Sequence, residues 1–327
     1  MRPALLAVLL AAAPAGAAAS AFGSQNAGTS AATFLTLGAD ARAAGMGNAV
    51  SASADDASGA YWNPADLARL RYRHATLTHA ASYQDTFFDF LAYAQPIDAP
   101  RGEGRARELP PEQLGTIAAA LLYQNAGRIS EVDNTGTPTG GSFTPQDIAA
   151  ILAWGSTIDR HFDVGISVKY VQSKIEATAG TGAADFGARW RTYVPGTEIG
   201  YALAADARNV GGPLKFRDAA DPLPLTLVLG QALRPFSSLT LDLDVVMPRD
   251  APVYESVGAE WRAPMTEDLS GALRVGYDGR LDSGALGGTT GIALGAGLGF
   301  RRLAFDYAWT PAGGLGDVSR LSMSYRF

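Results

Sequence analysis

The chain of 327 residues contains no cysteine, only three histidines and few charged residues, which make up 18% of the sequence. The lack of cysteine excludes disulfides, thiolate chemistry, cysteine-ligated metals and lipid attachment through an N-terminal cysteine. His74 and His79 have opposite parity on a strand, so they cannot share a metal ion. The sequence also contains no nucleophile elbow, HExxH motif or P-loop. We therefore expect a protein that is not an enzyme and that needs no metal or other cofactor.

Long apolar runs are missing beyond the first 19 residues. Within residues 1–19, Arg2 precedes an apolar core at 4–13 and an A-x-A sequence at 17–19, which predicts a signal peptide cleaved close to Ser20. An uncleaved anchor helix is the alternative, although the apolar core is too short to span a bilayer comfortably. If the mature chain is in a membrane, it must cross with strands.

An excess of positive charge is missing as well, because the formal net charge is -6 and the pI is about 5.1. This balance gives no electrostatic reason to expect nucleic acid as a partner. Glycine, in contrast, is abundant, with 38 residues. Many glycines and few charges are typical of a barrel with tight turns and an apolar outer belt.

From His74 onward, apolar and polar residues alternate with a period of two, as expected for strands. A soluble antiparallel sheet would alternate in the same way. The connections favour an outer-membrane barrel, because short turns and longer loops alternate along the chain. We predict an all-β fold, a 14-stranded antiparallel transmembrane β-barrel over residues 74–327. The predicted strands are 74–84, 86–97, 115–127, 144–158, 161–174, 183–194, 197–208, 223–234, 239–247, 253–262, 269–278, 290–300, 303–310 and 319–327.

Two connections break the alternation. The first hairpin, near Asp85, is tight although it falls on the outer side, and the Arg- and Glu-rich segment 98–113 is long although it falls on the periplasmic side. The long segment is either a contact surface or a solvated insertion. The predicted outer loops are 128–143, 175–182, 209–222, 279–289 and 311–318.

In these strands, charged residues alternate with the apolar outward residues and should therefore point inward. They are candidate polar residues of the lumen. They either form a polar conduit or pair with one another and bind the segment before the barrel. We favour pairing, because a charge that faces lipid at mid-depth would cost ~2–4 kcal/mol whereas one that faces the lumen need not. These candidates are Asp163, Lys169, Asp242, Asp244, Arg274 and Asp306.

Residues 20–73 precede the predicted strands and are rich in Ala, Gly and Ser. We expect a short helix near 31–37, a short strand at 49–54 and a turn at Asp55-Asp56. That acidic pair is a weak candidate for a hard cation, since no further oxygen-ligand spacing follows. After Trp62, Asn63 is a good N-cap and Pro64 suits the first helical position. The small residues allow this segment to pack inside the barrel as a plug.

Three stretches resemble the PorV/PorQ family of outer-membrane proteins, which is related to FadL-type transporters. They are GTSAATFLTLGADARAAGMGNAVSASADDASGAYWNPADLARL at 28–70, ARNVGGPLKF at 207–216 and FDYAWTPAGGLGDVSRLSMSYRF at 305–327. Asp66 departs from the family pattern, where glycine usually follows the Asn-Pro-Ala run.

The resemblance implies a 14-stranded barrel in the outer membrane with its N-terminal segment folded into the lumen. It also implies one of two activities. The main interpretation is a receptor or shuttle for cargo proteins that carry the C-terminal sorting domain of type IX secretion, with other secretion components as partners. The alternative is a FadL-like passive transporter of hydrophobic small molecules. Outer-membrane lipid is a partner in both.

Overall fold

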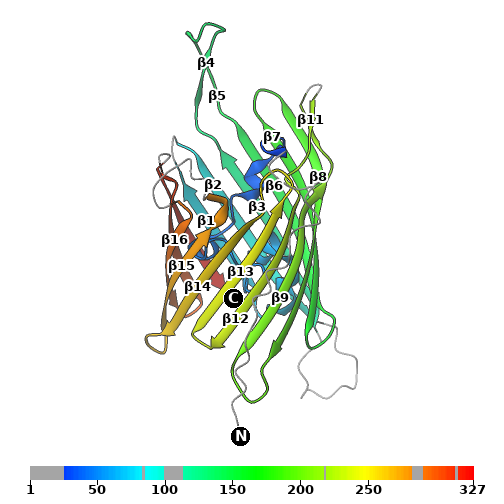
Figure 1. The fold of residues 1–327 in the computed structure, drawn as a ribbon, viewed down its shortest axis with the longest axis vertical. Coiled ribbons are helices and arrows are strands. Elements are labelled where there is room, and N and C mark those ends of the chain that lie inside the picture. The colour runs from blue at the N-terminus through cyan, green and yellow to red at the C-terminus, as the bar shows by residue number, and fades with distance from the viewer. Residues whose placement is uncertain (1–25, 83–84, 99–112, 217–218, 282–289, 314–315) are drawn as a thin grey trace.

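The structure is a computed structural model that describes residues 26–82, 85–98, 113–216, 219–281, 290–313 and 316–327. The predicted signal peptide and nearly all of the segment 98–113 lie outside the described residues. Fourteen antiparallel strands form a closed barrel (Figure 1) in the order β1-β18-β17-β16-β15-β14-β13-β12-β9-β8-β7-β6-β3-β2. The prediction of a 14-stranded antiparallel transmembrane barrel is confirmed.

The strand bounds lie close to the predicted ones. The barrel strands are β1 (His74–Ala81), β2 (Phe87–Asp98), β3 (Gln113–Asn125), β6 (Gln146–Thr157), β7 (Phe162–Lys174), β8 (Thr178–Tyr193), β9 (Gly200–Gly211), β12 (Thr226–Phe236), β13 (Leu239–Pro248), β14 (Tyr254–Pro264), β15 (Leu269–Asp278), β16 (Ile292–Phe300), β17 (Leu303–Pro311) and β18 (Asp317–Arg326).

Two predicted loops contain strands of their own. Within 128–143, β4 (Ile129–Val132) and β5 (Pro138–Phe143) form a hairpin that projects beyond the rim of the barrel (Figure 1). Within 209–222, β10 (Leu214–Phe216) pairs with β11 (Ala219–Asp221). The predicted loop 175–182 is shorter than expected, because β8 already begins at Thr178. A short 3₁₀ helix, η4 (Gly279–Leu281), follows β15.

The two ends of the barrel differ. We call the end with the short connections 158–161, 194–199, 237–238, 265–268 and 301–302 the turn end, and the end that carries the β4–β5 hairpin the loop end. In outer-membrane barrels, short turns face the periplasm and longer loops face the outside.

The outer face of the barrel carries large apolar side chains, as alternation with a period of two requires. Leu152, Val168 and Leu273 are each more than half exposed. On the neighbouring inward positions of β7, Asp163 and Lys169 are buried. This division into an apolar outside and a polar inside suits strands in contact with lipid. No helix within the described residues is long and apolar enough to cross a membrane.

The plug fills the space inside the strands. It contains η2 (Thr33–Thr36), α1 (Ala41–Gly45), α2 (Gly59–Trp62) and η3 (Pro64–Arg69), all shorter than seven residues. Its apolar side chains form the largest buried cluster together with inward residues of β2, β3 and β6, including Phe34, Tyr61 and Phe90. The plug is therefore the hydrophobic core of the molecule.

The strand expected at 49–54 is absent, and this expectation was wrong. The segment forms turns, in which the amides of Ser53 and Ala54 donate to the carbonyl of Val50. The amides of Val50 and Ser51 donate to the carboxylate of Asp244, each at 3.1 Å. These donors are therefore satisfied by a wall side chain, which removes the need for a partner strand.

Candidate functional site: the plug and its contacts with the barrel wall

The plug segment around Trp62 is held by capping interactions. Asp40 is the N-cap of α1, and its carboxylate accepts hydrogen bonds from the amide of Ala43 at 2.8 Å and from Nε1 of Trp62 at 2.7 Å. Asn63 is the N-cap of η3, and its Oδ1 accepts from the amide of Ala65 at 3.0 Å. Pro64 follows at the first helical position, as the sequence predicts, although the helix is 3₁₀ rather than α.

The wall approaches the plug through glycines that point into the lumen. A methyl group built at Gly165 would overlap the backbone of Pro64 and Ala65. The same test gives overlap between Gly276 and the backbone of Met46 and Gly47. Gly155, Gly258 and Gly295 meet plug backbone in the same way, whereas Gly187 meets the side chain of Asn63 and Gly230 that of Ser51. Plug backbone therefore lies against wall backbone, which any larger side chain would prevent.

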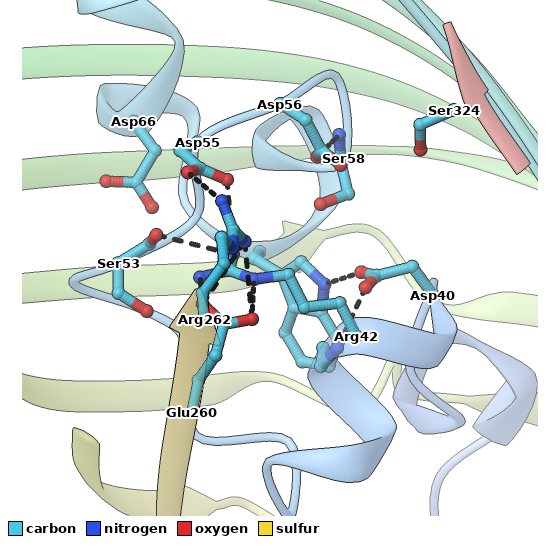
Figure 2. A network of polar contacts seen from close by, with 12 residues as sticks. Asp40, Arg42, Ser53, Asp55, Asp56, Ser58, Asp66, Glu260, Arg262 and Ser324 are labelled. Carbon is cyan, nitrogen blue, oxygen red and sulfur yellow. Dashed lines mark hydrogen bonds and ion pairs between the residues drawn. The ribbon is translucent and has the colours of Figure 1, made fainter. Parts of the chain in front are cut away.

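One group of ion pairs joins α1 to the wall formed by β14–β18; we call this the α1 contact (Figure 2). Buried Glu260 on β14 accepts from Nε of Arg42 at 3.0 Å and from Nε of Arg274 at 2.7 Å. Arg262 also bonds Glu260, at 3.2 Å. Three guanidinium groups thus surround one carboxylate, and Arg274 bonds Asp306 as well, at 2.7 Å.

A second group joins η3 to β6, β7 and β8; we call this the η3 contact. Asp66 on η3 pairs with Arg189 on β8, and Arg69 on η3 pairs with Asp163 on β7 at 2.9 Å. Asp163 also bonds Arg189 at 3.3 Å and Thr157 at 2.8 Å. The plug thus supplies one carboxyl group and one guanidinium group to this contact. The wall supplies Asp163, Arg189 and also Arg191, whose Nε lies 3.3 Å from Asp163.

The remaining candidate residues of the lumen also have plug or wall partners. Asp242 accepts from the hydroxyl of Ser53 at 3.0 Å, next to the two plug amides that bond Asp244. Lys169 donates to Asp185 and to Asn209, at 2.7 and 2.8 Å. All six candidate residues therefore lie in the lumen. They bond groups of the plug or of the wall, as the pairing interpretation expects, rather than lining an open polar conduit.

Asp55 and Asp56 lie side by side in the plug but have different roles (Figure 2). Asp55 pairs with Arg42 at 3.3 Å and with Arg262 at 3.8 Å, whereas Asp56 accepts from the amide of Ser58 at 2.8 Å. Burial, followed by the neighbouring Asp40 and Asp55 carboxylates, raises the pKa of Asp56 to about 6. In the described residues, no group of three or more His, Asp or Glu is placed to hold a metal ion.

The sequence reasoning missed both partners of one ion pair, Glu260 on the wall and Arg42 on the plug. Glu260 shares its parity with Ser256 and Gly258 in the predicted strand 253–262, so the period of two contained the signal for an inward carboxylate. Arg42 was overlooked because it lies in an Ala- and Gly-rich stretch. As the only arginine or lysine between residues 38 and 54, it needs a carboxylate if that stretch is buried.

The cavities that the described residues enclose around the plug are small, and each is lined by several charged side chains as well as by apolar surface. At the turn end, one of 150 Å³ lies around Arg42, Asp56 and Arg326, and one of 230 Å³ lies around Asp66, Arg189 and Arg234. A third, of 190 Å³, lies toward the loop end.

An apolar groove of 580 Å³ lies on the barrel strands over β12–β15, among outward residues such as Leu241, Val257 and Val275. Its position places it on the lipid side of the wall rather than along the lumen. None of these three cavities is a continuous apolar passage along the lumen, and hydrogen-bonded strand pairs close the barrel all the way round.

Comparisons with known proteins identify the class of fold. No family profile matches the chain, and no curated protein matches it. Among solved structures, the toluene transporter TodX of Pseudomonas putida aligns with a TM-score of 0.58 and 12% identity, over 88% of this chain and 98% of that one. The monoaromatic hydrocarbon channel CymD aligns with a TM-score of 0.54 and 12% identity, over 89% and 98%.

A FadL homologue of Pseudomonas aeruginosa aligns with a TM-score of 0.51 and 11% identity, over 88% of this chain and 98% of that one. The chain therefore has the fold of the FadL-like outer-membrane barrels. The finer resemblance to the PorV/PorQ family stays a prediction, because no PorV/PorQ protein is among these matches.

Proposed function

We propose that the protein is a channel of the outer membrane through which small hydrophobic molecules pass when the plug moves, and that the structure is its closed state. The observation that carries the proposal is the likeness to hydrocarbon channels over almost the whole of their length. The FadL-like alternative is thus preferred over the receptor. At this identity the likeness concerns the fold, so the substrate is part of the proposal.

The plug contacts explain why passage needs a movement. Small cavities lined by several charged side chains offer an apolar molecule no favourable path, because it would have to displace water from these groups without replacing its hydrogen bonds. The plug is held by short-range contacts, ion pairs and glycine packing, and none of its helices exceeds six residues. A segment of this kind can rearrange while the barrel strands keep their hydrogen bonds.

The absence of cysteine allows a direct test. Ser53→Cys on the plug and Asp242→Cys on the wall replace two side chains that are in hydrogen-bond contact. In cells that lack other hydrocarbon channels, uptake of labelled toluene should be supported by the native chain and by the reduced double variant. Oxidation should abolish uptake by the double variant, and reduction should restore it. Each single-cysteine variant is the matched control.

Equal uptake by the oxidised and the reduced double variant would show that passage does not need the plug to move. No uptake by the native chain above that of empty cells would refute the channel itself.

The β4–β5 hairpin favours a second candidate, the receptor for cargo proteins with a C-terminal sorting domain. All four residues of β4 are exposed, and the hairpin projects away from the barrel (Figure 1), where it can contact a large partner. Mass spectrometry of proteins that co-purify from the native outer membrane tests this candidate. It predicts recovery of proteins that share such a domain, with less recovery after deletion of residues 129–143. Recovery of the barrel with bound lipid alone would contradict it.

A further inference from the structure

The 230 Å³ cavity at the turn end is rich in hydrogen-bond donors. It lies between η3 of the plug and the wall strands β8, β9, β12 and β13, close to their ends at the turns. Tyr193, Tyr201 and Thr240 complete its wall. Its charged lining residues are Arg69, Arg189, Arg191, Arg234, Asp55 and Asp66.

Several guanidinium N–H groups that line this cavity form no hydrogen bond with the residues that the structure describes. Arg189 is only 8% exposed, and although its two terminal nitrogens bond Asp66 and Asp163, its Nε has no hydrogen-bond partner. Nε and one terminal nitrogen of Arg191 are likewise buried without a hydrogen bond. Leaving a buried charged donor unsatisfied costs more free energy than leaving a neutral one, so such groups indicate a missing acceptor.

The carboxylates nearby do not supply that acceptor. Asp163 already accepts hydrogen bonds from Arg69, Arg189 and the hydroxyl of Thr157, and its ion pair with Arg191, at 3.3 Å, is not a hydrogen bond. Asp55 is directed to Arg42 and Arg262, on the side of the neighbouring cavity. Four guanidinium groups therefore share the remaining acceptors of this cavity.

Asp66 does not supply it either. Burial raises the pKa of Asp66 well above its usual range; Arg189 opposes this effect, and the carboxylates of Asp206, Asp163 and Asp244 add to it. Its Oδ2 is buried and has no hydrogen-bond partner. In its neutral form this carboxyl group carries a proton to donate and no negative charge, so it is a weaker acceptor than a carboxylate.

Arg234 adds a charge that has no direct contact with a described carboxylate, although its field acts on Asp55. It lies at the end of β12, opposite Gly200 of β9, and forms no hydrogen bond or ion pair within the part of the chain that the structure describes. Its side chain is exposed at the mouth of the cavity. A free guanidinium group at the entrance and unsatisfied ones inside are an arrangement suited to an anion with several oxygens.

We propose that this cavity binds an oxyanion, a phosphate or carboxylate group that enters from the turn end and bonds Arg189, Arg191 and Arg234. The group has two possible sources, the headgroup of an anionic phospholipid in the facing membrane leaflet or a free anion in the periplasm. The site is independent of whether the lumen conducts hydrophobic molecules, because it needs no movement of the plug.

Arg234→Gln is the informative variant, because it removes a charge from the cavity without breaking a contact among the described residues. Arg160→Gln is its matched control, an exposed arginine at the same end whose side chain does not line the cavity. The full chain is purified in detergent, and its thermal unfolding is followed with inorganic phosphate or with sodium chloride at equal ionic strength. Native mass spectrometry then measures retention of phosphatidylglycerol against phosphatidylcholine.

A free-anion site predicts a saturable increase in thermal stability with phosphate but not with chloride. A headgroup site predicts selective retention of phosphatidylglycerol. In either case, Arg234→Gln should weaken binding about tenfold, the equivalent of one lost charge-assisted hydrogen bond, and Arg160→Gln should leave it unchanged. Equal binding by both variants, or no specific binding of either probe, would mean that the cavity holds water alone and would overturn the proposal. If Arg234→Gln does not fold, Arg191→Gln replaces it.

Discussion

The plug is attached to the barrel at the α1 contact and at the η3 contact, and both combine glycine packing with buried ion pairs. At both, inward glycines let plug backbone lie against the wall, and a buried guanidinium–carboxylate group joins the two parts. At the α1 contact, three arginines surround Glu260. At the η3 contact, Asp163 of the wall also has three arginine partners, of which Arg69 comes from the plug. The carboxyl group that the plug itself supplies there, Asp66, is buried among other carboxylates and has one arginine partner. The clearest difference is therefore between Glu260 at the α1 contact and Asp66 at the η3 contact.

The largest expected effect is that of Glu260→Gln, which leaves buried Arg42 and Arg274 without their shared carboxylate. Removing one partner of a buried ion pair typically costs ~3–5 kcal/mol of stability. The measurement is urea unfolding of the barrel in lipid, followed by gel mobility. Glu255→Gln, at an exposed position of the same strand, is the control. Similar unfolding of the two variants would show that the α1 contact is not held electrostatically.

Glycine packing should contribute less, and alike at the two contacts. Gly165→Ala at the η3 contact and Gly276→Ala at the α1 contact each place a methyl group against plug backbone, and overpacking of this kind costs ~1–3 kcal/mol. Gly182→Ala is the control, because the nearest atom to its added methyl group is 3.9 Å away. Heat-dependent gel mobility compares the three. Wild-type stability of either test variant would argue against direct backbone contact there.

Asp66→Asn should have a smaller effect than Glu260→Gln, within about 1 kcal/mol. Burial raises the pKa of Asp66 so that the neutral carboxyl group is favoured, and the positive charge of Arg189 is also offset by Asp163. A neutral amide of the same shape can then replace the carboxyl group and still accept from Arg189. Unfolding in urea at neutral pH measures the difference. A loss as large as that of Glu260→Gln would remove the proposed distinction between the two contacts.

The last expected effect depends on pH and comes from Asp56. Its pKa in the folded chain, about 6, lies above the ordinary value of 3.8. The folded state therefore binds the proton more tightly, and this contribution to stability is full below about pH 4 and is lost as the pH rises through about 6. Asp56→Asn should remove this part of the pH dependence, and thermal unfolding at pH 4.5, 6 and 7.5 would reveal it. An unchanged profile would exclude Asp56 as its source.

The barrel strands could be predicted from the sequence because each strand shows its own alternation of apolar and polar residues. In β7, the alternation of Phe162, Asp163, Val168 and Lys169 assigns both faces without reference to any neighbour. The plug offers no comparable pattern. The sequence at 49–54 alternates like a strand, yet its amide donors are satisfied by Asp244, nearly 200 residues away in the chain. Local pattern cannot reveal a partner at that separation.

The candidate site was partly predictable for the same reason. Parity placed Asp163, Asp242 and Asp244 inside, and the Asn63-Pro64 pair identified the start of η3. Parity says nothing about which plug atom each wall residue meets, so the Arg42–Glu260 pair and the match of Gly165 to Pro64 required the structure. The function of the plug depends on these pairings.

The plug also constrains the order in which the molecule is built. It precedes β1 in the chain, yet the amide of Ala41 donates to Ser322 of β18, and Arg320 of β18 donates to the carbonyl of Leu37. The seam of the barrel is the pairing of β1 with β18. The N-terminal segment must therefore be enclosed before the seam forms, and the final strand meets the barrel edge and the plug in a single step. The wall then closes and the plug is enclosed in the same step. A chain with a misplaced plug would lack the plug groups that bond β18, the last strand to be added.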